Sequence, residues 1–169
     1  MATAFVAVGA CATACPLNPA YRADEFEFYL SDLNAKALIV EAGSISPAVD
    51  VAKKLGVNVI VLTPQPAAGA FTLSAEKSCG AVSQPGPAQT NDIALVLHTS
   101  GTTSRPKIVP LAQKNVCASA AHISQTLTLN AEDRGLNIMP LFHIHGLIAG
   151  VLTPLSAGSH TPRTPAFNP

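Results

Sequence analysis

A strand–helix–strand pattern in the first half of the chain restricts the fold more than any other feature. The segments "ALIV", residues 37–40, and "VNVIVL", residues 57–62, are short and mostly apolar, which is typical of strands buried on both faces of a sheet. Between them, Ser46 and Pro47 form a helix start and Gly56 a helix end. Two parallel strands joined by a crossover helix follow from this order. The sequence therefore predicts an α/β fold with mainly parallel strands and crossover helices.

Further elements are expected on both sides of this unit. Residues 63–92 are rich in Pro, Gly, Ala, Ser and Gln and show no periodicity, so they are expected to form an irregular excursion or a linker. Residues 159–169 hold three prolines and are expected to be a disordered tail. The remaining predicted elements are a helix at 22–34, a strand at 93–98, an extended piece at 108–111, a helix through 116–127, a strand at 135–140 and a loop entering a helix at 142–155.

Composition limits the classes of partner. The formal net charge is zero, so no basic surplus is available for nucleic acid or for an anionic membrane surface. No uncharged apolar run reaches the roughly 18 residues that a membrane-spanning helix needs. Charged residues are only 12% of the chain, against about 25% in typical domains. Either the alanine-rich composition explains this value, or part of the surface is normally covered by chain that is not present here.

The cysteines do not indicate a metal or disulfide framework. Cys11, Cys15, Cys79 and Cys117 lack the two-residue spacing of a zinc knuckle or a redox motif, and they are expected to be reduced thiols. Cys11 and Cys15, four residues apart, are expected on one face of a helix. The apolar N-terminal segment lacks the basic start of a signal peptide, and a cytoplasmic location is expected.

The segment "TSGTTSRPK", residues 99–107, follows the strand predicted at 93–98 and is the strongest candidate for a binding site. Small residues allow close approach of the backbone, and N–H groups, hydroxyls and a lysine can surround phosphate oxygens. A P-loop is disfavoured, because Pro106 precedes Lys107 and Ile108 follows it, whereas that motif needs Gly-Lys-Ser/Thr. The residues alone leave two interpretations open, a phosphate-binding loop and a flexible surface turn.

Three segments together are similar to a known family. "LHTSGTTSRPK" resembles the phosphate-binding signature of the adenylate-forming superfamily, the AMP-dependent synthetases and ligases, and "PLNPAY" (16–21) and "GLNIMPLFHIHGL" (135–147) resemble further segments of it in the same order. Within the superfamily, the sequence is similar to acyl-CoA ligases of the oxalate type, relatives of coumarate-CoA ligases. The resemblance implies that residues 1–158 are part of the large N-terminal AMP-binding domain.

The resemblance also implies a reaction, its co-substrates and its site residues. A carboxylic acid would attack the α-phosphorus of ATP, with Mg²⁺, to give an acyl-adenylate, and the thiol of coenzyme A would then displace AMP to form a thioester. His143 would lie beside the route of the acyl group and the thiol, and is the candidate catalytic residue. No protein partner is implied. The residues expected to contact the ATP phosphates are Thr99, Ser100, Gly101, Thr102, Thr103 and Lys107.

Some positions depart from the family pattern. Ser104 and Ile108 stand where most relatives have glycine, and a β-branched residue such as Ile108 tolerates neither positive φ nor close approach. Ala112 stands where relatives often have Thr or Ser able to cap the next helix, which corresponds to a loss of about 1 kcal/mol. His143 and His145 could also be two ligands of a metal ion, but no Asp, Glu or Cys lies close by in the sequence to complete a zinc site, and packing remains a further alternative.

Several family segments have no counterpart in the chain. These are the aromatic segment beside adenine, the acidic residue that binds the ribose and the C-terminal domain with its catalytic lysine. We therefore expect an acid-CoA ligase by descent whose isolated chain is inactive; the alternative is a vestigial phosphate-binding or interaction fragment. The last three residues, Phe-Asn-Pro, are not the Ser-Lys-Leu signal of peroxisomal proteins.

Overall fold

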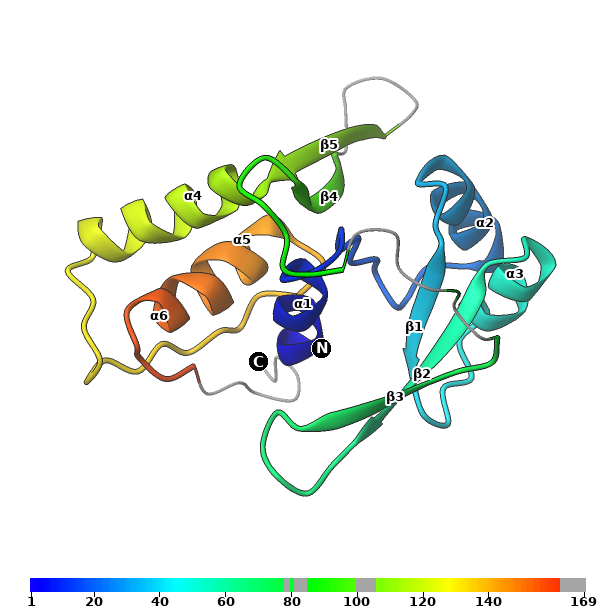
Figure 1. The fold of residues 1–169 in the computed structure, drawn as a ribbon, viewed down its shortest axis with the longest axis horizontal. Helices are drawn as coiled ribbons and strands as arrows, with labels where there is room; N and C mark the ends of the chain where they lie inside the picture. Colours follow the sequence, from blue (N-terminus) through cyan, green and yellow to red (C-terminus); the bar gives the residue numbers. More distant parts are fainter. Residues whose placement is uncertain (78–79, 81–84, 100–105, 162–169) are drawn as a thin grey trace. The chain divides into compact units, whose positions relative to one another are not determined.

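The computed structural model describes residues 1–77, 80, 85–99 and 106–161 and contains two compact units (Figure 1). Unit 1 consists of Met1–Pro16 and Gly86–Pro169, and unit 2 of Leu17–Pro85. The elements of unit 2 are α2 (Ala23–Asp32), β1 (Ala37–Glu41), α3 (Ala48–Lys54), β2 (Asn58–Pro64) and β3 (Phe71–Ala75). The elements of unit 1 are α1 (Ala2–Gly9), β4 (Ile93–Thr99), β5 (Lys107–Ala112), α4 (Gln113–Thr126), α5 (Ile144–Leu147), the π-helical turn η1 (Ile148–Leu152) and α6 (Thr153–Ser156).

Unit 2 contains the predicted crossover. Strands β1 and β2 are parallel, with their register running from Ala37 opposite Asn58 to Glu41 opposite Leu62, and α3 connects them (Figure 1). Helices α2 and α3 pack on each other and on the strands through one buried apolar cluster. Its members are Phe26, Leu30, Ala48, Val51, Ala52, Val57 and Val59.

The ends of α3 follow from local chemistry. The Ser46 hydroxyl accepts a hydrogen bond from the Ala48 N–H at 3.3 Å, which satisfies one of the backbone donors left free at a helix start. After the helix, Gly56 has φ +73°, a conformation that glycine adopts without steric cost. The predicted end at Gly56 is therefore confirmed, whereas the helix begins one residue later than the sequence indicated, with Pro47 at the N-cap and Ala48 as the first helical residue.

Two expectations about the strands need correction. Strand β3 lies inside the segment 63–92 that showed no periodicity, and it pairs antiparallel with β2. Strands β4 and β5 are also antiparallel, so the described sheets are mixed rather than mainly parallel. The α/β class holds, but β1 is half-buried along its middle instead of buried on both faces. The strand β3 was missed because four of its five residues are exposed, and an exposed strand needs no apolar pattern.

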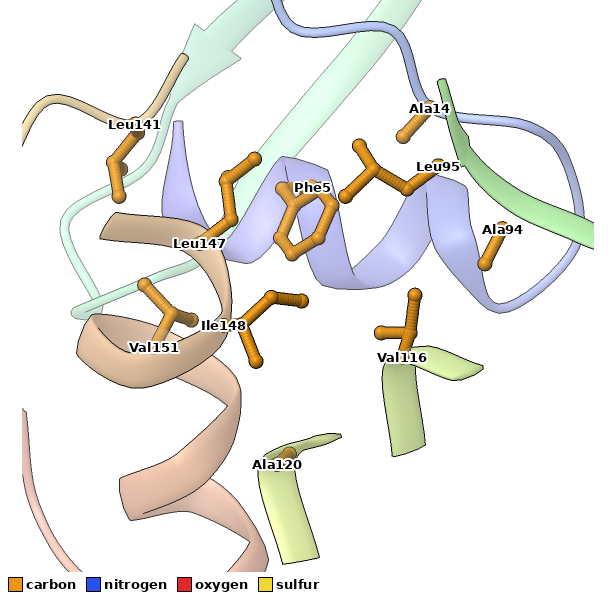
Figure 2. Close-up of a cluster of buried hydrophobic side chains, with 10 residues drawn as sticks. All are labelled: Phe5, Ala14, Ala94, Leu95, Val116, Ala120, Leu141, Leu147, Ile148 and Val151. Atoms are coloured by element: carbon orange, nitrogen blue, oxygen red, sulfur yellow. The ribbon is translucent and has the colours of Figure 1, made fainter. Parts of the chain in front are cut away.

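Unit 1 is built around the strand β4. On one edge β4 pairs with β5, and on the other Ala14 forms a parallel bridge with Leu95. Figure 2 shows Phe5 of α1 pointing into a cluster shared with β4, α4 and the α5–η1 segment. The ten buried residues of the cluster are Phe5, Ala14, Ala94, Leu95, Val116, Ala120, Leu141, Leu147, Ile148 and Val151. Helix α1 therefore contributes Phe5 to the core of unit 1.

Other expectations for unit 1 had mixed outcomes. The loop entering a helix that was expected at 142–155 is confirmed, since α5, η1 and α6 follow one another from Ile144 to Ser156. The strand expected at 135–140 is wrong, because no strand of the described structure falls in this segment and Asn137 makes only an isolated bridge. Cys11 and Cys15 do not share a helix face, since α1 ends at Gly9. Cys11, Cys15 and Cys117 carry free thiols, whereas Cys79 and the tail from 162 onward lie outside the described residues.

Two tyrosines are stacked at the start of unit 2. The rings of Tyr21 and Tyr29 lie 4.8 Å apart at 12°, and the edge of Phe26 meets Tyr21 at 5.9 Å. Burial, a hydrogen bond with Tyr29 and the charge of Glu25 raise the pKa of Tyr21 to about 12. An unfolded tyrosine titrates near 10, so the folded state retains this proton more strongly.

We expect the tyrosinate absorbance of the folded chain to show a step near pH 12 that is lost in Tyr21→Phe. The chain holds two tyrosines and no tryptophan, which keeps the signal simple. Because the raised pKa favours the folded state below about pH 10, its contribution to the free energy of unfolding should disappear as the pH rises through about 12. A folded chain without that step would contradict the tyrosine stack.

Helix α4 begins with an incomplete cap. The N-cap residue Ala112 has extended backbone, and its N–H donates to the Asn115 side-chain oxygen at 3.0 Å. Alanine offers no oxygen in return to the N–H groups of the first turn, so only one half of a reciprocal cap is present.

We expect Ala112→Ser to raise the free energy of unfolding of unit 1 by about 1 kcal/mol, because the new hydroxyl can accept from the first turn of α4. The matched control is Ala118→Ser at an exposed position inside α4, which should lower stability by about 0.5 kcal/mol. Urea unfolding followed by circular dichroism measures both. Equal or reversed effects of the two substitutions would show that α4 does not lack a cap.

Candidate functional site

The hydroxyl-rich segment begins at the end of β4 and ends at the start of β5, and these two strands are antiparallel. In the antiparallel register, Thr99 is opposite Lys107 and His98 is opposite Ile108. Mainly parallel strands were expected, but the strands on either side of the segment are antiparallel, and β4 has only a parallel bridge on its other edge. The structure thus brings the first and last residues of the candidate loop into one cross-strand pair. Ser100, Gly101, Thr102 and Thr103 lie outside the described residues.

The pair at the mouth of the loop presents a hydroxyl and a cation. Residues directly opposite in a hairpin project on the same face, and Thr99 and Lys107 are both exposed. A threonine hydroxyl can donate to an oxygen, and the lysine ammonium supplies three donors and a charge. These donors fit phosphate oxygens, and neither side chain of the pair has a negative charge that would repel a phosphate.

Ile108 fits its place in β5. The expectation was that a β-branched residue at this position is unsuitable where relatives have glycine. Ile108 is a strand residue opposite His98, and Asn34 and Thr128 are the non-glycine residues with positive φ in the described ranges. A β-branched side chain is favourable in a strand, so the departure brings no backbone strain here.

The hairpin is anchored through its first strand. Leu95 is fully buried, Ala14 donates its N–H to the Ala94 carbonyl at 2.9 Å, and Val96 donates to the Ala14 carbonyl at 2.9 Å. The Thr13 hydroxyl adds a bond to the Ile93 carbonyl at 2.7 Å. The base of β4 is therefore fixed to the segment after α1, and the exposed Thr99 lies at the free end of the strand.

His143 lies on a second element of unit 1, at the N-cap of α5. Its N–H donates to the Pro140 carbonyl at 3.2 Å, and its carbonyl accepts from the Leu147 N–H at 3.1 Å. The imidazole is exposed and lies 4.7 Å from the Phe142 ring at 48°. The backbone of the turn therefore fixes where His143 is presented.

His145 is also exposed. In the described part of the chain, no three His, Cys, Asp or Glu side chains come together in a way that could hold a metal ion. The described structure thus offers no additional ligands for a zinc site at these two histidines.

Cys15 differs from a reactive thiol, because burial raises its pKa in spite of a hydrogen bond with the Val96 backbone.

A close-packed contact beneath the His143 turn was not identified from the sequence. A Cβ on Gly146 would collide with the Pro140 carbonyl oxygen, and one on Gly150 would collide with the side chain of Asn137. Asn137 itself is only 5% exposed. The spacing of the two glycines in "GLIAG" was the available signal, since glycine inside a helical segment often marks close approach of another backbone.

No helix among the described residues has the length and apolar character that crossing a bilayer requires.

Comparison with known proteins places the chain in a family. The family model described as AMP-binding enzyme matches residues 1–167. The chain is 45% identical over 160 residues to the Probable CoA ligase CCL9 of Humulus lupulus, which covers 92% of this chain and 30% of the relative. It is 44% identical over 150 residues to the oxalate–CoA ligase of Arabidopsis thaliana, which covers 88% of this chain and 29% of the relative.

A solved structure agrees with these relatives. The malonyl-CoA ligase complex with methylmalonyl-CoA and AMP bound has a TM-score of 0.75 at 27% identity, over 99% of this chain and 33% of that one. The chain thus spans about a third of the length of the proteins that it matches. The chain therefore belongs to the family of AMP-binding enzymes, the adenylate-forming ligases.

Proposed function

We propose that this chain supplies the phosphate-binding part of an ATP-dependent acid-CoA ligase. The observation that carries the proposal is the cross-strand pair of Thr99 and Lys107 at the mouth of the hairpin loop. The similarity of the chain to an oxalate–CoA ligase and to a CoA ligase supports the same reaction class. We extend the proposal to a small carboxylic acid of the oxalate or coumarate type as substrate.

The roles of the residues follow from their chemistry. Lys107 would neutralise charge on the phosphates, and Thr99 would orient them by a hydrogen bond, together with the hydroxyls and backbone of Ser100, Gly101, Thr102 and Thr103. Catalysis of phosphoryl-type transfer consists mainly of such positioning and charge stabilisation. Mg²⁺, when bound, would neutralise further phosphate charge. His143, exposed at the start of α5, would lie beside the acid and the thiol of coenzyme A.

The exposed apolar side chains of unit 1 support a role as part of a larger structure. Leu136, Ile138 and Ile144 are 63%, 55% and 49% exposed, although large apolar residues are usually covered. Together with the low charge content, this surface favours a fold that further chain completes. The adenine, ribose and catalytic lysine segments of the family would come from that further chain, so we propose that the 169-residue chain alone does not turn over.

We expect calorimetric titration to show that ATP binds the purified chain and that the heat of binding is smaller for Lys107→Ala. Loss of a charge-assisted contact typically removes about 1.5–3 kcal/mol, which corresponds to an affinity lowered about tenfold or more. Lys114→Ala is the matched control, because the Lys114 ammonium donates to the Asn91 side-chain oxygen and is not part of the candidate site. This variant should bind ATP as the unchanged chain does. Equal heats in all three proteins would favour the alternative, a vestigial fragment whose loop no longer holds phosphate.

Pyrophosphate release tests the second part of the proposal. The chain incubated with ATP, Mg²⁺, coenzyme A and oxalate should release none, while the full-length Arabidopsis oxalate–CoA ligase assayed beside it provides the positive control. Acid-dependent release by the chain alone would contradict its proposed inactivity. Hydrolysis of ATP without any acid would contradict the ligase assignment and favour an ATP hydrolase.

A further inference from the structure

Asn137 is a buried polar side chain with no role in the predicted site. It lies in the extended segment before the His143 turn and is only 5% exposed. Its side-chain amide donates to the Gly146 carbonyl at 3.1 Å, and its side-chain oxygen accepts from the Met139 N–H at 2.9 Å. One side chain therefore satisfies two backbone groups on opposite sides of the turn.

The turn held in this way is the one that carries His143. Met139 precedes His143 by four residues, and Gly146 follows it by three. Within the turn, the His143 N–H bonds to the Pro140 carbonyl at 3.2 Å, and the Leu147 N–H bonds to the His143 carbonyl at 3.1 Å. The Asn137 bridge closes this segment at its base.

The surrounding packing is shaped around the amide. Gly150 of η1 faces Asn137 so closely that an added Cβ would collide with the Asn137 side chain, and an added Cβ on Gly146 would collide with the Pro140 carbonyl oxygen. Both glycines lie in a buried or half-buried helical segment, and its neighbours Leu147, Ile148 and Val151 are core residues (Figure 2). The core thus fixes the helix, the missing side chain of Gly150 leaves room for Asn137, and that of Gly146 leaves room for the Pro140 carbonyl.

We propose that Asn137 is a positioning residue for His143, acting through the backbone of the turn 139–146. The inference rests on the proposed function for the meaning of His143, and on the contacts above for the positioning itself. His143 has an exposed imidazole and a backbone bonded on both sides, so moving the turn moves the ring. An asparagine is required because one group must donate to a carbonyl while the other accepts from an N–H.

The test is the NMR signal of the histidine rings in the intact chain. The chain holds five histidines, and His143→Gln identifies the resonance of His143. Asn137→Asp keeps the size and the acceptor but places a carboxylate oxygen against the Gly146 carbonyl, so the His143 ring resonance should shift while that of His122 on α4 stays in place. As the pH falls and the new carboxyl regains a proton, it can donate again, and the His143 resonance should approach that of the unchanged chain at the same pH.

A second variant tests the same contact without a change of charge. Gly150→Ala should displace the amide of Asn137 and shift the His143 resonance in the same way. The matched controls are Asn130→Asp, at an exposed position of unit 1, and Gly9→Ala, where an added Cβ meets nothing within 4 Å. Both should leave the His143 signal unchanged.

Two results would overturn the proposal. One is an unchanged His143 resonance in folded Asn137→Asp and Gly150→Ala. The other is an equal shift of all histidine resonances in both variants, which would make Asn137 a general core residue. These signals do not depend on ATP, so the NMR experiment decides the role of Asn137 even if the chain fails to bind ATP and the proposed function is overturned.

Discussion

The pairing of β4 on both of its edges is the interaction on which unit 1 depends. Ala14 bridges Leu95 on one side, and β5 pairs along the other. Leu95 is fully buried in the same cluster as Phe5, so the strand, the segment after α1 and the helix α1 are stabilised together. Burial of large apolar side chains such as these supplies the main favourable free energy of folding. Thr99 is the last residue of this strand. Its position is therefore fixed by the pairing and burial of the residues that precede it.

A second arrangement of the same kind supports His143. The α5–η1 helical run contributes Leu147, Ile148 and Val151 to the core, while its two glycines face the segment that precedes it. The exposed histidine therefore extends from a turn whose other side is closely packed. In both places an exposed polar side chain is attached to backbone that buried residues hold, a common design for binding and catalytic residues. The two elements share one unit, and unit 2 has a separate core built on its parallel crossover.

How far the sequence could be read differs between the parts of the chain. The crossover of β1, α3 and β2 was predictable because apolar runs, a serine cap and a terminal glycine are all local signals. Strand β3 was not, because it is exposed and exists through its pairing with β2. The expected strand at 135–140 had suitable side chains, but most of the segment has no ladder partner within the described ranges. Of the candidate site, Thr99, Lys107 and His143 are placed by the structure, and residues 100–105 lie outside the described residues.

The sequence by itself determined the α/β class, the positions of most helices and the family, because these depend on periodicity and on motifs that are contiguous in the chain. Only the tertiary structure decided that β4 and β5 are antiparallel, that Thr99 is opposite Lys107 and that Ile108 is an ordinary strand residue. It also revealed the contacts of Asn137, whose bonds to Met139 and Gly146 depend on how a helix packs against the segment before it. Strand pairing and close packing bring together residues that no local pattern connects, which is the physical reason for this division.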